Sequence, residues 1–293
     1  MESGIREVED NAEATEAWNG PLYEVWIKYR DLVAEGVRKH GDNAVRLVPP
    51  AAGDRVLDIG CGLGDTTKRL LEMVGEEGSA HGVDVAERMI ATAVAEARES
   101  GAANLTFAVQ DVETEPFDRQ FDYAFSRMGT MFFANPVVAL RNVRQALSPG
   151  GVLNMVVWRR KLDNDMMHRA ELVVAEYLDE PEESEAPRCG PGPFSMANAD
   201  TVTDVLVHAG FGDIRLSRQD LPYRIGNDLD QAVAFNMDLG PAAELLRMWG
   251  HRIDEIRPKI KADLKAALSD FVQADGSVVA PASTWAISAC NPG

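Results

Sequence analysis

A short apolar segment that runs directly into three alternating glycines constrains the fold of this chain more than any other feature. Residues 56–64 read Val-Leu-Asp-Ile-Gly-Cys-Gly-Leu-Gly. Glycines allow the backbone to turn tightly and to approach a ligand with no side chain between them. The helical pattern that follows would direct its free N–H groups at the same place. The segment therefore predicts a strand, a ligand-binding turn and a helix, in that order.

Short apolar runs and helical patterns alternate from this segment to about residue 160. Such alternation is typical of parallel strands joined by crossover helices. The expected strands are residues 55–59, 79–84, 105–110, 123–127 and 152–157, and the expected helices are residues 66–74, 86–99 and 137–147. We therefore expect an α/β fold with a doubly wound, mainly parallel sheet.

Two further runs, at residues 212–216 and 284–289, would complete a seven-stranded sheet. The sequence Ser148-Pro149-Gly150-Gly151 predicts a turn before the fifth strand, because proline and glycine do not continue a helix.

The connections between these elements predict four parts. They are an N-terminal helical lid at 1–48, a ligand-binding core at 49–160, an inserted cover at 161–200, and the end of the sheet at 201–293 with a helical insertion at 227–280. Both insertions are longer than ordinary connections in α/β units, so we expect each to cover a functional site. The acidic run at 179–185 is interpreted as a solvated loop.

Charge and composition exclude several classes of function. The formal net charge of -18 over 293 residues argues against nucleic acid and against an anionic membrane surface as partners. No apolar run is long enough to span a bilayer, and the first residues lack the pattern of a secretory signal. We therefore expect a soluble, cytoplasmic protein. Cys61, Cys189 and Cys290 form no CxxC pair and are interpreted as reduced.

The residues around the glycines favour a ligand that carries an amino acid. Asp58 can pair with an ammonium group, and the glycine turn can pack against a ribose and a carboxylate. Asp65 stands where a dinucleotide-binding loop would have its third glycine. A carboxylate there would repel a pyrophosphate, which disfavours NAD and FAD.

Further candidate ligand contacts stand where the next strands end. Asp84 closes the second expected strand and can accept hydrogen bonds from both ribose hydroxyls, although a helix cap is the alternative role. Asp111 closes the third strand and could accept a hydrogen bond from an adenine amine. Ser126, Arg127 and Met128 end the fourth strand, over the switch point of the sheet.

The glycine loop, Asp84, Asp111 and the 148–151 turn together resemble class I S-adenosylmethionine-dependent methyltransferases. Trp18-Asn19-Gly20-Pro21, Phe132-Phe133 and Gly192-Pro193-Phe194 resemble the bacterial small-molecule methyltransferases that are related to ubiquinone and menaquinone biosynthesis enzymes. The resemblance implies strand order 3-2-1-4-5-7-6 with the last strand antiparallel. It also implies S-adenosylmethionine as the cofactor and in-line methyl transfer to a small, partly apolar metabolite.

The resemblance and the strand ends together give a set of expected cofactor contacts. They are Asp58, Gly60, Cys61, Gly62, Asp84, Val85, Met89, Asp111, Val112, Ser126 and Arg127. Within this set, Val85 and Met89 match the apolar residues that sandwich the adenine in the family.

The acceptor side carries weaker signals. Trp18, Phe133 and Trp158, together with Trp26, are candidate acceptor contacts, although the N-terminal aromatic residues could instead pack on the sheet. If the acceptor needs a base, the candidates are His168, Tyr23 and Arg127. No sequence pattern indicates a metal site. We also expect the segment through about residue 29 to be a mobile lid, because an aromatic stripe follows an acidic leader.

Two alternatives to a methyltransferase remain open. A non-catalytic protein that binds S-adenosylmethionine would share the cofactor residues, but the long insertions argue against it. A nucleotide-dependent oxidoreductase would share the sheet, but Asp65 argues against it.

Overall fold

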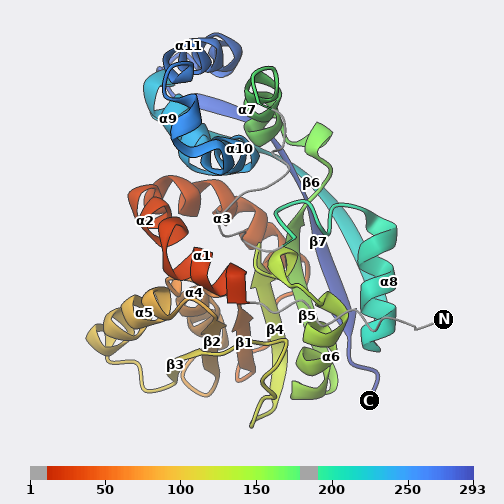
Figure 1. The fold of residues 1–293 in the computed structure, drawn as a ribbon. Helices are drawn as coiled ribbons and strands as arrows, with labels where there is room; N and C mark the ends of the chain where they lie inside the picture. Colours follow the sequence, from red (N-terminus) through yellow and green to blue (C-terminus); the bar gives the residue numbers. More distant parts are fainter. Residues whose placement is uncertain (1–11, 179–190) are drawn as a thin grey trace, which may run out of the picture.

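The centre of the molecule is a seven-stranded sheet. A computed structural model describes residues 12–178 and 191–293 (Figure 1). The strands are β1 (Arg55–Ile59), β2 (Ser79–Asp84), β3 (Leu105–Val109), β4 (Phe121–Arg127), β5 (Leu147–Trp158), β6 (Gly212–Gly226) and β7 (Val278–Cys290). Their order is β3-β2-β1-β4-β5-β7-β6. β1 to β5 pair in parallel, and β7 runs antiparallel to both β5 and β6. The predicted order and the antiparallel last strand are confirmed.

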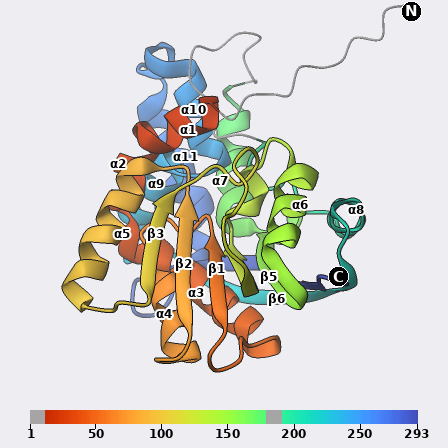
Figure 2. The same cartoon turned by 90° about the horizontal axis from the view of Figure 1, so that it is seen from below.

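Helices surround this sheet and also gather beyond one end of it. The α-helices are α1 (Ala12–Asn19), α2 (Pro21–Lys28), α3 (Arg30–Leu47), α4 (Asp65–Val74), α5 (Glu87–Ser100), α6 (Pro136–Ala146), α7 (Asp165–Ala175), α8 (Ala199–Ala209), α9 (Leu229–Asp238), α10 (Pro241–Trp249) and α11 (Arg257–Leu268). α4 and α5 pack on β1 to β3, and α3 packs on β5, β6 and β7. α7, α10 and α11 lie together beyond the end of the strands (Figure 1), and the view from below shows α5 beside β3 and α6 beside β5 (Figure 2).

The sixth and seventh strands are longer than the sequence predicted. β5 pairs with β7 only as far as Trp158 and Thr284, whereas β6 and β7 pair onward to Gly226 and Val278. The two strands therefore form a ribbon that extends past the rest of the sheet. α9 packs on this ribbon, and α7, α10 and α11 pack around α9 and one another. The ribbon thus supports a helical cover.

The predicted turn at residues 148–151 is a bulge inside β5. α6 ends at Ala146, so the sequence does stop the helix there. The pairing with β4 then jumps from Phe121 with Leu147 to Tyr123 with Val152. Gly150 has a φ of +80°, which glycine adopts without steric penalty. The strand therefore begins earlier than predicted and carries an excursion near its start.

A buried hydrogen-bond network fixes α3 against the sheet. The Asn154 amide Nδ2 lies 2.9 Å from the carbonyl oxygen of Ala44 and 2.7 Å from the Tyr123 hydroxyl oxygen. The Tyr123 hydroxyl in turn donates to the carbonyl of Val48, at 2.7 Å. These bonds satisfy carbonyl groups in the last turn of a helix, which have no partner within the helix itself. They hold α3 in a fixed position over β4 and β5.

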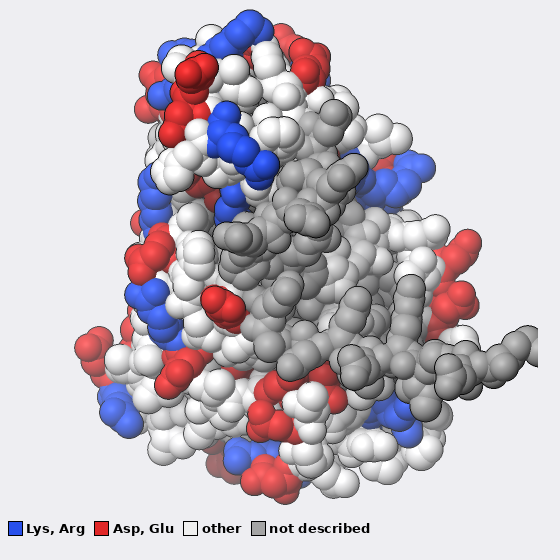
Figure 3. All heavy atoms as spheres, in the orientation of Figure 1, with Lys and Arg blue, Asp and Glu red and all other residues white. Residues whose placement is uncertain are grey.

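Acidic and basic side chains intermingle over the described surface that faces the viewer in Figure 3. No helix among residues 12–178 and 191–293 is long and apolar enough to cross a membrane. Cys61 and Cys290 are free thiols. The acidic leader at 1–11, the acidic run at 179–185 and Cys189 lie outside the described residues.

Candidate functional site

The glycine loop turns between β1 and α4 and opens onto a cavity. Gly60, Gly62 and Gly64 have φ values of +66°, +55° and +79°, in the left-handed region that favours glycine. A Cβ atom on Gly60 would lie 2.9 Å from the Cα of Gly129, so the loop lies directly against the end of β4. A Cβ on Gly62 would meet only the Met89 sulfur, at 3.6 Å. The open side of Gly62 therefore faces the cavity.

Asp84 holds this loop from the end of β2. Its Oδ2 accepts a hydrogen bond from the Gly62 N–H at 2.8 Å, and its Oδ1 accepts one from the Ala86 N–H at 2.9 Å. Burial raises the pKa of the carboxyl group, and these backbone donors oppose the rise. Asp84 also lines the cavity. One carboxylate therefore holds the glycine loop and Ala86, the residue before α5, and also faces the cavity.

Asp58 lies beneath the loop and does not line the cavity. It is 1% exposed, and its Oδ2 accepts a hydrogen bond from the Thr67 hydroxyl at 2.6 Å. Burial raises the pKa of Asp58 to about 7, while Thr67 and the Arg127 charge oppose the rise. The expected direct contact with an ammonium group is therefore corrected: Asp58 can act on a ligand only through the loop or through Arg127.

Two other expected contacts point away from the cavity. The Ser126 hydroxyl is buried and donates to the carbonyl of Ile59 at 2.9 Å. The Cys61 sulfur is directed toward β2, since a Cβ on Gly82 would lie 2.8 Å from it. Side chains alternate between the two faces of a strand, so residues next to a ligand-facing position turn away from it. Neither Ser126 nor Cys61 is among the cavity residues.

Arg127 enters the cavity from the end of β4 as a half-buried charge. It forms no hydrogen bond and no ion pair with any residue in the described ranges. Burial lowers its pKa, and the carboxylates of Asp58, Asp65 and Asp42 oppose that effect from a distance. A guanidinium that faces a cavity without a direct partner can pair with an anionic group of a ligand.

The cavity has a volume of about 1010 Å³, and its lining residues come from segments between Ala14 and Arg257. This is at the upper end of the range for small-molecule sites. Eight of the expected cofactor contacts line it: Gly60, Gly62, Asp84, Val85, Met89, Asp111, Val112 and Arg127. All four expected acceptor contacts line it as well: Trp18, Trp26, Phe133 and Trp158. The expected cofactor contacts and the expected acceptor contacts therefore line the same cavity.

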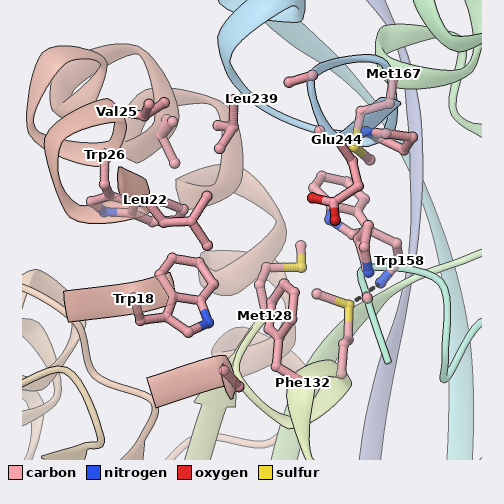
Figure 4. Close-up of a pocket in the computed structure, with 18 of the residues that line it drawn as sticks. Trp18, Leu22, Val25, Trp26, Met128, Phe132, Trp158, Met167, Leu239 and Glu244 are labelled. Carbon is pink, nitrogen blue, oxygen red and sulfur yellow. Dashed lines mark hydrogen bonds between the residues drawn. The ribbon is translucent and has the colours of Figure 1, made fainter. Parts of the chain in front are cut away.

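Aromatic and methionine side chains line much of the cavity, and Trp18 and Trp26 among them pack against Leu63 of the glycine loop. Figure 4 shows Trp18, Leu22 and Trp26 on one side of the cavity and Trp158, Met167 and Glu244 on the other. The Trp18 ring meets the rings of Trp26 and Phe132 edge to face, with centroids 5.7 and 5.3 Å apart. The aromatic residues of α1 and α2 thus line the cavity and pack at the same time.

Two of the three expected bases stand outside the cavity. The Tyr23 hydroxyl lies 3.5 Å from the Thr92 hydroxyl on α5, and the Arg88 guanidinium lies over the Tyr23 ring. His168 lies on α7, with Nδ1 3.4 Å from Glu171. Trp26 faces the cavity from α2, whereas Tyr23, three residues earlier, packs on α5. The structure therefore gives neither Tyr23 nor His168 a contact with the cavity.

The sequence did not indicate two cavity residues whose polar groups matter for the chemistry of the site. Glu244 lies on α10 and points into the cavity (Figure 4), and Tyr223 reaches it from β6. Both come from the ribbon and the cover, whose positions depend on contacts far apart in the chain. No local motif marks either residue. Within the described residues, no cluster of three or more His, Cys, Asp or Glu side chains could hold a metal ion.

Comparison with known sequences finds relatives of the part of the chain that carries the glycine loop. Residues 50–188 match the family model described as "Methyltransferase domain". Aklanonic acid methyltransferase DauC of Streptomyces sp. (strain C5) is 38% identical over 124 residues, which are 42% of this chain and 56% of that protein. The ubiquinone/menaquinone biosynthesis C-methyltransferase UbiE of Pseudomonas fluorescens is 32% identical over 155 residues, which are 51% of this chain and 60% of that protein. The chain thus spans somewhat more than half the length of these relatives.

A solved structure has a similar fold over the whole chain. Phosphoethanolamine N-methyltransferase 2 of Haemonchus contortus, in complex with S-adenosyl-L-methionine, has a TM-score of 0.56 and 18% sequence identity. The match covers 100% of this chain and 62% of that one.

The raised pKa of Asp58 predicts a pH-dependent stability. The native pKa is about 7, against an ordinary value of 3.8, so the folded protein holds this proton more tightly than the unfolded chain. The resulting stabilisation is complete below pH ~4 and is lost as the pH rises through ~7. Relative to Asp58→Asn, the wild-type free energy of unfolding should fall by on the order of 4 kcal/mol across this window.

Urea unfolding of both proteins at several pH values measures this difference. Asp204→Asn, on the exposed surface of α8, is the control and should follow the wild type at each pH. A constant difference between Asp58→Asn and the wild type would show that Asp58 is ionised in the native protein throughout.

Proposed function

Because residues 50–188 match the family model described as "Methyltransferase domain", we propose that this chain transfers the methyl group of S-adenosylmethionine to a small, partly apolar acceptor. One observation carries the proposal. A single cavity joins the glycine loop, Asp84 and Arg127 to a chamber of aromatic and methionine side chains. Such a cavity is large enough to hold a cofactor and an acceptor side by side.

The residues of the loop half fit S-adenosylmethionine. Each Asp84 oxygen keeps a free lone pair beyond its backbone bond and can accept from a ribose hydroxyl. Val85 and Met89 flank the place for the adenine, and Asp111 stands at its edge. The unpaired Arg127 would then lie at the methionine end and pair with its carboxylate.

The reaction requires little covalent chemistry from the protein. S-adenosylmethionine supplies a methyl group on a sulfonium, and the acceptor atom forms its new bond to carbon as the carbon–sulfur bond breaks and leaves its electrons on sulfur. The chain's own residues align the two molecules and keep water out. The apolar side chains of α1, α2, α7 and α10 serve both purposes.

Glu244 is the residue that we assign to the acceptor proton. Its carboxylate points into the cavity on the side of Trp158 and Met167, and it pairs with Arg247 on its own helix at 2.5 Å. A carboxylate in that position can accept a hydrogen bond from a hydroxyl or amine and take its proton as the methyl group arrives. Arg127, the remaining base candidate, belongs by this account to the cofactor.

The segment of α1 and α2 is proposed as a lid over this cavity. α2 has no buried residue, although Leu22, Val25 and Trp26 face the cavity. Asn19 attaches the end of α1 to the core, because its Nδ2 donates to the Val85 carbonyl at 3.4 Å and its Oδ1 accepts from the Arg88 N–H at 3.3 Å. These contacts lie beside the adenine end, so occupancy of that end would order the lid.

Asp84→Asn tests the cofactor site. Loss of one acceptor oxygen should weaken S-adenosylhomocysteine binding by about 1 to 3 kcal/mol, because a ribose hydroxyl loses its partner. Isothermal titration calorimetry gives the affinity. Asp118→Asn, an exposed change outside the cavity, should bind like the wild type. Equal affinities in both variants would place the ribose elsewhere, and tight NADH binding without any S-adenosylhomocysteine binding would favour an oxidoreductase.

Glu244→Gln tests the acceptor side. The variant should bind S-adenosylhomocysteine normally, since Glu244 is remote from the glycine loop. Incubation with a metabolite extract and methyl-labelled S-adenosylmethionine should give product labelled at a rate roughly 10²-fold lower than the wild type. Mass spectrometry identifies and quantifies the product. Unchanged product formation would remove Glu244 from the mechanism, and no product from the wild type would favour a non-catalytic binding protein.

Hydrogen exchange tests the lid. Addition of S-adenosylhomocysteine should increase the protection of residues 12–28, because a bound adenosine fills the space beneath them. Asn19→Ala should reduce that gain, whereas protection of the β5 amides should stay constant. Full protection of residues 12–28 in the free protein would mean that the two helices belong to the permanent core.

A further inference from the structure

Tyr223 occupies an unusual position in the ribbon of β6 and β7. It pairs with Ala280, beyond the point where β5 ends, and only 2% of its surface is exposed. Its ring lies against the backbone of α3 at Gly36, where an added Cβ would stand 2.2 Å from the Tyr223 Cζ. Only glycine at position 36 leaves room for the ring. The Trp158 ring flanks it, with centroids 6.0 Å apart.

The hydroxyl of this side chain has no hydrogen-bond partner among residues 12–178 and 191–293, although Tyr223 lines the cavity. Burial raises the pKa of Tyr223, so the hydroxyl remains protonated and able to donate. The ring is buried while Tyr223 lines the cavity, so the side chain is held in one place and a ligand in the cavity can accept the hydrogen bond of the hydroxyl.

Arg127 is a second unpartnered donor facing the same cavity. It comes from β4 and lies near enough for its charge to oppose the rise in the Tyr223 pKa. Its Cδ lies beside Gly41 of the same helix that carries Gly36, since a Cβ on Gly41 would stand 3.0 Å from it. A positive guanidinium and a neutral hydroxyl donor together suit a carboxylate.

We propose that Tyr223 is a positioning residue that donates a hydrogen bond to the cofactor carboxylate paired with Arg127. This inference rests on the proposed function and adds to it. Tyr223 lies outside residues 50–188, so the methionine end of the cofactor is held jointly by the methyltransferase domain and the ribbon that supports the cover. Alignment of the sulfonium with the acceptor then depends on both parts. A carboxylate on the acceptor is the other source of the same chemistry.

Two ligands that differ only in the cofactor carboxylate can show whether Tyr223 binds that carboxylate or one on the acceptor. Tyr223→Phe should lower the affinity for S-adenosylhomocysteine about tenfold, the size of a hydrogen bond to a charged group. It should leave the affinity for decarboxylated S-adenosylhomocysteine unchanged. Arg127→Met should show the same selectivity for the carboxylate. Tyr29→Phe is the control, because Tyr29 is also a buried residue but its hydroxyl already donates to Asp238 at 2.8 Å.

The results that overturn the inference are distinct from failure of the proposed function. Equal losses for both ligands would mean that Tyr223 acts through packing alone. No loss for either would place the hydroxyl on the acceptor side, and the anion it binds would then belong to the acceptor. If the wild type binds neither ligand, the proposed function itself is wrong. Gly36→Ala, which displaces the Tyr223 ring, should reproduce the selective loss in a variant that keeps the hydroxyl.

Discussion

The two backbone hydrogen bonds that Asp84 accepts determine the shape of the site. They tie the middle of the glycine loop and the entry of α5 to the end of β2. The loop can take this path because its glycines adopt left-handed φ values and because Gly60 lies directly on Gly129. The open face of Gly62 and the free lone pairs of Asp84 then point into one space. Cofactor binding in this account follows from that constraint.

The ribbon of β6 and β7 provides the other half of the arrangement. It carries α9 beyond the sheet, and the helices around α9 place Glu244 opposite the lid. Its own Tyr223 reaches back over Gly36 toward Arg127. Glu244 pairs with Arg247, whereas Arg127 has no direct partner among the described residues. In the proposed function, Arg127 is therefore the charge that is available to the carboxylate of a ligand.

Local patterns predicted the parts of the fold that depend on local physics. Apolar periodicity and glycines gave the first five strands, the loop and Asp84, because these follow from neighbours in sequence. The lengths of β6 and β7 were missed because Pro222 and Pro281, which face each other in the ribbon, lack the backbone N–H of a regular strand. The sequence placed Asp58, Cys61 and Ser126 near the ligand but could not give the direction of their side chains. The positions of Tyr223 and Glu244 in the cavity depend on contacts between distant parts of the chain, which no sequence motif indicates.

A crystal structure of the protein with S-adenosylhomocysteine tests the central claim most directly. The account predicts the ribose hydroxyls on the Asp84 carboxylate, the adenine between Val85 and Met89, and the carboxylate within hydrogen-bond distance of both Arg127 and the Tyr223 hydroxyl. The sulfur would face the chamber lined by Trp18, Trp158 and Glu244. A ligand whose ribose lies away from Asp84, or whose sulfur faces away from that chamber, would contradict the claim that one cavity joins cofactor and acceptor.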